Sequence, residues 1–133
     1  MPYLIDTDIL IYSLKNNAIV NNNFRAHEHH PKAVSVISYG ELLIGARRSV
    51  HIEKNLAVIY RIRELFPIVP IDQSVIETFS IVKSALLGRG SILDDMDMLI
   101  ASTALTLNYI LVTNNEKHFK RVPGLLFENW SKE

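Results

Sequence analysis

The amino-acid sequence predicts one α/β domain over residues 1–133, a three-layer α/β/α sandwich with a mainly parallel sheet of four or five strands. Short apolar runs alternate with longer segments of helical periodicity, as in β-α-β connectivity. A chain of 133 residues, 48% of them hydrophobic, can bury one ordinary core. Polar side chains follow several apolar runs, and parallel sheets bind ligands beyond the carboxyl ends of their strands. We therefore expect any ligand-binding site to lie at the edge of the sheet formed by the carboxyl ends of its strands.

The composition excludes few functions. Lys plus Arg and Asp plus Glu each number 14, so net charge provides no general attraction to nucleic acid. The absence of cysteine excludes disulfides and thiolate metal sites and fits a reducing compartment. The sequence has neither a signal-peptide pattern nor eighteen consecutive apolar residues. We expect a soluble, cytoplasmic protein without a membrane partner.

The first expected strand, residues 3–5, runs directly into Asp6, Thr7 and Asp8. A helix over residues 9–15 should follow, with Thr7 or Asp8 as its N-cap. Two carboxylates at the end of a buried strand are costly unless a cation or strong hydrogen bonds offset their charge. The stretch therefore forms either a turn or an acidic metal site.

The next elements are a polar segment, a strand and a helix. Residues 16–32 predict a loop or a frayed helix, and the β-branched run 33–37 predicts the second strand. Ser38 and Glu41 have the S-x-x-E spacing of a capping box, which predicts a helix toward residue 48. Glu41 is therefore either a cap or a ligand.

Two more helices and an edge strand are expected before residue 88. Apolar residues on helical spacing predict a helix over residues 52–66, which Pro67 ends. Residues 68–71 form a short extended piece near a sheet edge because they include a proline. Asp72 should cap a helix through Leu87.

Three acids, Asp94, Asp95 and Asp97, begin the last long helix. Asp94 and Asp95 suit helix capping and the helix dipole, whereas Asp97 lies too far into the first turn to be the cap. Residues 109–112 predict a buried strand and residues 125–127 a final one. The inward stripe of the helix should consist of Met96, Ile100, Thr103 and Leu107.

Polar residues from separate segments should converge at the carboxyl edge of the sheet. They are Asp6 and Asp8, Glu41, the acids of residues 94–97, and Asn114 and Asn115. Carboxylate and amide oxygens suit Mg²⁺ or Mn²⁺ better than zinc or copper. Such an ion can activate water and stabilise in-line displacement at a phosphodiester. That chemistry is typical of a nuclease.

Several motifs, taken in order, carry a resemblance to a known family. They are LIDTD at residues 4–8, Ser38 to Leu42 with Gly45 and Ala46, DMLIA at 97–101, and LVTNN at 111–115 followed by Phe119 and Trp130. Over essentially the whole chain this set resembles the PIN-domain family, and within it the VapC-type ribonuclease toxins of toxin–antitoxin pairs. The resemblance implies a single PIN-like nuclease domain.

The resemblance also implies a site. Asp6, Glu41 and Asp97 match the carboxylates that hold Mg²⁺, for which Mn²⁺ substitutes, and Asn115 would help to position the reaction. The family often has a fourth acid where this chain has Asn114 and Asn115. This departure leaves open whether one or two metal ions act.

Other residues receive supporting roles. Thr7, Asp8 and Thr113 would support the ligands through hydrogen bonds, and Asn114, Asp94 and Asp95 are further candidates near the site. Arg47, Arg48 and Arg89 could bind the RNA backbone, although a solvated helix face explains them equally well. The histidines of residues 27–30 are interpreted as solvated surface, and Trp130 as a residue that packs on the core or a partner.

By this resemblance, we expect a metal-dependent endoribonuclease that acts on RNA such as tRNA. The implied partners are an antitoxin that inserts a segment into the acidic groove and a second copy in a homodimer. A PIN-like scaffold that binds RNA without cutting it is one alternative. A receiver-like phosphoacceptor domain is another, with Asp72 as the acceptor, but residues 113–115 lack the lysine that it needs.

Overall fold

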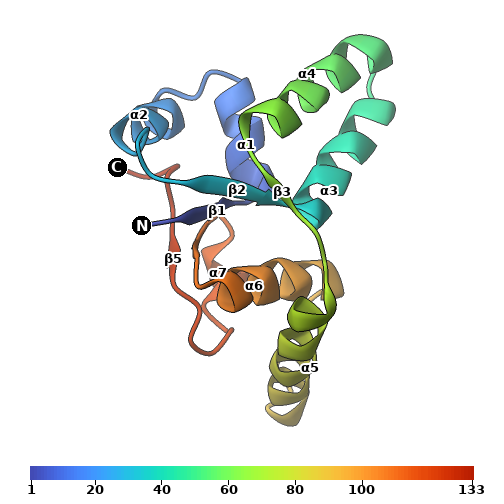
Figure 1. Ribbon diagram of the computed structural model, residues 1–133, viewed down its shortest axis with the longest axis vertical. Helices are drawn as coiled ribbons and strands as arrows, with labels where there is room; N and C mark the ends of the chain where they lie inside the picture. The colour runs from blue at the N-terminus through green and yellow to red at the C-terminus, as the bar shows by residue number, and fades with distance from the viewer.

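A computed structural model describes residues 1–133 and contains a five-stranded sheet in which every neighbouring pair is parallel (Figure 1). The strand order is β3–β2–β1–β4–β5. The strands are β1 (Tyr3–Ile5), β2 (Lys32–Ser35), β3 (Ile68–Val69), β4 (Ile110–Val112) and β5 (Phe127–Glu128). The helices are α1 (Thr7–Leu14), α2 (Ala18–Ala26), α3 (Val36–Arg47), α4 (Ile52–Leu65), α5 (Gln73–Gly88), α6 (Asp95–Leu107) and α7 (Glu116–Phe119).

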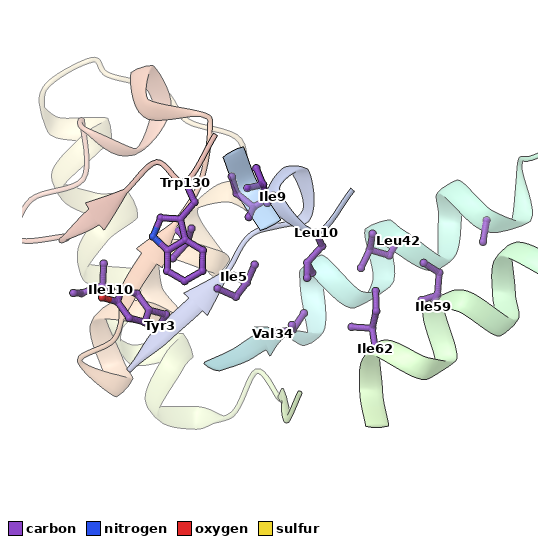
Figure 2. Packing of buried hydrophobic residues seen from close by; sticks show 13 residues of the cluster. Tyr3, Ile5, Ile9, Leu10, Val34, Leu42, Ile59, Ile62, Ile110 and Trp130 are labelled. Atoms are coloured by element: carbon purple, nitrogen blue, oxygen red, sulfur yellow. The ribbon is translucent and has the colours of Figure 1, made fainter. Parts of the chain in front are cut away.

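Two hydrophobic clusters, one on each face of the sheet, confirm the three-layer sandwich. Tyr3 and Ile5 belong to the cluster that includes residues of α1–α4 and Trp130 (Figure 2), whereas Leu4 belongs to the cluster with α5, α6 and α7. Successive strand residues point to opposite faces, so a strand covered on both faces is apolar throughout. This is why the central β1 reads as a continuous apolar run, with all its residues buried.

The polar residues between β1 and β2 form a helix, α2, in place of the expected loop or frayed helix. The Asn17 side chain caps α2 by accepting a hydrogen bond from the Val20 main-chain N–H at 3.0 Å. Val20 is fully buried, and Phe24 packs edge-on against Trp130. One apolar stripe is therefore enough to hold a helix whose overall composition is polar.

Two predicted helix starts are wrong by a few residues. Helix α1 begins at Thr7 with Asp6 as its N-cap, in place of Thr7 or Asp8. Helix α3 begins at Val36 with Ser35 as its N-cap, so Ser38 lies inside the helix and is buried. Glu41 is then beyond the first turn and cannot close a capping box, which removes the capping interpretation of Glu41.

The second half of the chain follows the prediction closely, apart from the buried face of α6. Asp72 caps α5 through a 3.0 Å hydrogen bond from Val75 N–H, as expected. Met96 and Leu107 are exposed, whereas α6 buries Met98 and residues 100–104. The helix is covered by the sheet on one side and packs against α5 on another, so its buried face is wider than one stripe.

The strand order also bears on the receiver-like alternative. Receiver domains have the order 2-1-3-4-5, in which the first and third strands are neighbours. Here β1 lies between β2 and β4, and β3 is an edge strand. The order therefore contradicts a receiver-like fold. None of the helices is both long and apolar enough to span a membrane.

Candidate active site

A hollow of about 200 Å³ opens at the carboxyl edge of the sheet. Its lining residues come from the ends of β1 and β4 and from α1, α3 and α6. They are Asp6, Thr7, Asp8, Ile11, Glu41, Asp97 and Asn115. The lining contains four carboxylates and no lysine or arginine, so negative charge accumulates there.

Asp6 is the buried carboxylate of the hollow, with 6% of its surface exposed. Its main-chain N–H donates to the Val112 carbonyl at 2.9 Å, which continues the β1–β4 ladder by one residue. The carboxylate accepts hydrogen bonds from Thr7 N–H and Thr113 Oγ1, both at 2.8 Å. Burial, and then the neighbouring Asp8 charge, raise the pKa of Asp6 to about 7 although both hydrogen bonds lower it.

Asp8 lies in the first turn of α1 and connects two elements of the site. Its Oδ1 accepts a hydrogen bond from Ile9 N–H at 2.7 Å, and its Oδ2 accepts one from Asn114 N–H at 3.1 Å. Burial raises the pKa of Asp8, and these hydrogen bonds oppose the shift. Asp8 therefore ties α1 to the segment that follows β4.

Glu41 reaches the hollow from the middle of α3. The Thr7 hydroxyl donates to Glu41 Oε1 at 2.8 Å, so a residue next to Asp6 orients the second carboxylate. Thr7 also supplies the N–H that bonds Asp6. One threonine at the start of α1 thus contacts two of the predicted ligands.

Asp97, Asn115 and His118 meet on the other side of the hollow. His118 Nδ1 lies 3.1 Å from Asp97 Oδ2 and 2.8 Å from Asn115 Nδ2. The sequence interpretation missed His118 because nothing in residues 116–119 shows that α7 turns back toward α6. The one available signal was its position a single helical turn after the polar Thr113 to Asn115 segment.

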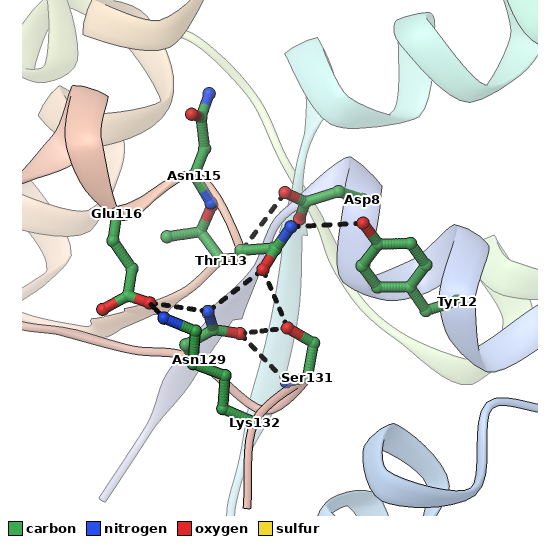
Figure 3. A network of polar contacts seen from close by, with 9 residues as sticks. Asp8, Tyr12, Thr113, Asn115, Glu116, Asn129, Ser131 and Lys132 are labelled. Atoms are coloured by element: carbon green, nitrogen blue, oxygen red, sulfur yellow. Dashed lines mark hydrogen bonds and ion pairs between the residues drawn. The ribbon is translucent and has the colours of Figure 1, made fainter.

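Residues near the C-terminus form hydrogen bonds and an ion pair with the segment that follows β4 (Figure 3). The Asn114 side-chain amide donates to Tyr12 Oη at 3.2 Å, and its oxygen accepts from Asn129 at 3.1 Å and Ser131 at 2.8 Å. Glu116 forms a 2.7 Å ion pair with Lys132. These contacts hold Asn114 against the C-terminal residues 129–132. The Asn114 side chain therefore lies outside the hollow.

Several predicted site residues also lie outside the hollow. Asp94 is the N-cap residue of α6 without a side-chain capping bond, and Asp95 pairs with Lys83 at 3.0 Å. Arg89 donates to the Arg121 carbonyl at 3.1 Å. Arg47 and Arg48 are at the C-terminal end of α3, six or seven residues beyond Glu41. At 1.5 Å per residue this is roughly 9 Å or more along the helix axis.

The donor set of the hollow fits a hard divalent cation. Its four carboxylates and one amide provide oxygen ligands. The pKa of Asp6 is raised first by burial and then by the Asp8 charge, and a bound cation would offset both effects. No three His, Cys, Asp or Glu side chains lie close enough together to form a complete metal group. Glu41 is held toward Thr7 and Asp97 toward His118, so the donors surround the hollow without meeting at one point.

Comparisons with known proteins agree with this fold and site. The family described as PIN domain matches residues 3–125. Ribonuclease VapC2 of Rickettsia felis is 32% identical over 99% of this chain and 100% of its own length. The tRNA(fMet)-specific endonuclease VapC of Shigella flexneri is 31% identical over 98% of this chain and 99% of its own.

Solved structures of similar sequence have the same architecture. The chain in the crystal structure of VapBC2 from Rickettsia felis bound to a promoter DNA fragment superposes with a TM-score of 0.91 at 32% identity, over 98% of this chain and 99% of that one. The structure of VapBC-1 from nontypeable Haemophilus influenzae gives a TM-score of 0.88 at 29% identity, over 99% of this chain and 100% of that one. The chain belongs to the PIN-domain family and, within it, to the VapC group.

Proposed function

We propose that this protein is a divalent-metal-dependent endoribonuclease and the toxin of a VapBC-type toxin–antitoxin pair. The observation that carries the proposal is the acidic hollow at the carboxyl edge of the sheet, which four carboxylates line without a lysine or arginine. Mg²⁺ is the expected ion, with Mn²⁺ as a substitute, because the donors are oxygen atoms.

In this proposal Asp6, Glu41 and Asp97 hold the cation. A cation bound there would lower the pKa of water and neutralise developing charge on a phosphodiester. Thr113 and Thr7 orient the buried Asp6 carboxylate and favour its ionised form through their hydrogen bonds. The Asn115 main-chain N–H donates to Thr113 Oγ1 at 3.0 Å, and its side-chain amide lines the hollow. In this proposal the amide helps to position the reacting groups.

The proposed substrate is RNA, with tRNA as the first class to test, because the Shigella flexneri relative is named for tRNA(fMet). Contacts from Arg47, Arg48 and Arg89 to the RNA backbone stay a prediction. None of these arginines lines the hollow, so they would act on parts of the RNA beyond the cleaved bond.

An antitoxin is the proposed protein partner, since the similar solved structures are VapBC complexes. A groove of about 530 Å³ runs between α1, α3 and α4, with Leu14, Leu42 and Ile59 in its wall. It shares Ile11 and Glu41 with the acidic hollow. An antitoxin segment with an apolar face could fill this groove and continue into the hollow. We also propose a homodimer, for which the exposed apolar residues of α5 offer a surface.

Cleavage of RNA by the purified protein tests the proposal. We expect Mg²⁺ or Mn²⁺ to support cleavage, and Asp6→Asn and Asp97→Asn each to abolish it. Asp72→Asn is the matched control, because it removes one carboxylate but keeps an acceptor that can cap α5. Cleavage that survives both site substitutions would show that the roles are misassigned.

An RNA-binding scaffold without catalysis is the second candidate, and the amides Asn114 and Asn115 in place of a fourth acid favour it. Calorimetric titration with Mn²⁺ separates the two functions. Binding that disappears in Asp97→Asn supports the nuclease, whereas a wild-type protein that binds RNA but no Mn²⁺ supports the scaffold.

A further inference from the structure

We infer that His118 supplies a nitrogen ligand beside Asp97 to the cation of the acidic hollow, and that it shifts the preference of the site from Mg²⁺ toward Mn²⁺. This inference rests on the proposed metal-dependent function. It concerns a residue that the sequence interpretation did not identify, at the side of the hollow where the acid expected after β4 is replaced by amides.

The structure holds the His118 ring in place against the hollow. His118 lies in α7. The next residue, Phe119, is completely buried in the hydrophobic cluster that includes residues of α5 and α6. The His118 main-chain N–H donates to the Asn115 carbonyl at 3.2 Å. The ring nitrogen Nδ1 is thereby brought against two residues that line the hollow, Asp97 and Asn115.

The two contacts of Nδ1 depend on whether this nitrogen carries a hydrogen. If the nitrogen accepts a hydrogen from the Asn115 amide, its lone pair is used there and the Asp97 oxygen at 3.1 Å has no donor. If the nitrogen instead donates to Asp97, it faces the amide donor of Asn115. With the amide turned over, its oxygen accepts from the same N–H, so one hydrogen on Nδ1 satisfies both contacts in the metal-free protein. A cation in place of that hydrogen would be bound by both Asp97 and His118.

The spacing of the pair also suits a common ion. Adjacent ligands of an octahedral ion with bonds of about 2.1 Å lie roughly 3.0 Å apart. The separation of His118 Nδ1 and Asp97 Oδ2 is 3.1 Å. Ions of this class retain several waters, so a few protein ligands at the hollow are sufficient.

A nitrogen ligand changes which ion the site prefers. Mg²⁺ prefers an all-oxygen shell, whereas imidazole suits transition metals. Replacing His118 by Asp should therefore lower the affinity for Mn²⁺ relative to that for Mg²⁺. His118→Gln should weaken Mn²⁺ binding by about tenfold or more, because losing even an outer-shell partner of a metal ligand typically costs about that much. The His118 side chain is about half exposed, so neither substitution disturbs the core.

Pulsed electron paramagnetic resonance of the Mn²⁺-loaded protein tests the inference directly, because nitrogen bound to Mn²⁺ modulates the echo through its nuclear spin. His30→Gln is the matched control. His30 and His27 form another close nitrogen pair, with their Nδ1 atoms 3.0 Å apart, that could capture the ion. Titration calorimetry with Mn²⁺ and Mg²⁺ on the same variants gives the two affinities.

We expect nitrogen modulation in the wild type and in His30→Gln, and its loss in His118→Gln. Bound Mn²⁺ without nitrogen modulation in the wild type, or modulation that persists in His118→Gln, would overturn the inference and leave the proposed nuclease intact. A wild-type protein that binds no Mn²⁺ would overturn the metal-dependent function as well.

Discussion

Replacing Asp6 by Asn should change how the stability of the metal-free protein depends on pH. Burial and the Asp8 charge raise the pKa of Asp6 from 3.8 to about 7 in the folded protein. Between these two values the folded state keeps the proton that the unfolded chain has lost, so rising pH favours unfolding. The asparagine side chain of the variant carries no charge and removes this dependence.

The size of the effect follows from the shift. A rise in the pKa of Asp6 from 3.8 to about 7 corresponds to about 4 kcal/mol of stability. All of this stability is lost once the pH exceeds the pKa of Asp6 in the folded protein. About 2.5 kcal/mol of this loss falls between pH 5 and pH 8. Asn keeps only one of the two acceptor oxygens that Thr7 and Thr113 use, which costs about 1 kcal/mol at every pH.

Urea unfolding with a chelator present, at pH 5 and pH 8, measures these differences. We expect Asp6→Asn to be clearly more stable than the wild type at pH 8, with an advantage about 2.5 kcal/mol smaller at pH 5. Asp72→Asn controls for the loss of one carboxylate at an ordinary helix cap. Mn²⁺ added at pH 8 should stabilise the wild type more than the variant.

A stability difference between Asp6→Asn and the wild type that is the same at both pH values would refute this reasoning. It would mean that the Asp6 carboxylate ionises in the folded protein as easily as in the unfolded chain. The burial penalty and the repulsion from Asp8 that we assign to this carboxylate would then be absent.

Three further substitutions probe the core, the site and the chain end. Ile5→Ala, in the central strand, should lower the free energy of unfolding by about 3 kcal/mol in urea denaturation, and a loss below about 1 kcal/mol would contradict its central packing. Thr113→Val removes a hydrogen bond that lowers the pKa of Asp6, so the rise of RNA cleavage with pH should move to higher pH; an unchanged profile would argue against that role. Asn129→Ala removes its hydrogen bond to Asn114 and should lower Tm by a few degrees and speed amide hydrogen exchange near residue 114, whereas unchanged exchange would show that the tail does not hold this segment.

The strands and most helices could be predicted because their signals are local. The buried runs of β1 and β4 and the cap of α5 at Asp72 are contained in a few consecutive residues. Helix starts were harder to predict where several capping residues stand together. Asp6 caps α1 while it also contacts Thr113, which is 107 residues away in the chain. Capping preferences of neighbouring residues cannot predict a contact between residues so far apart in the chain.

By itself, the sequence determined the sandwich, the edge of the sheet where acids would gather, and the chemical class of their donors. Apolar periodicity and the carboxyl ends of strands are properties of short stretches, so they can be read without coordinates. Only the tertiary structure decided that Glu41 is free of capping, that Asp94 and Asp95 lie outside the hollow, and that His118 meets Asp97. These outcomes depend on how α3, α6 and α7 pack around the sheet, because contacts between distant segments are made by packing and not by neighbours in sequence.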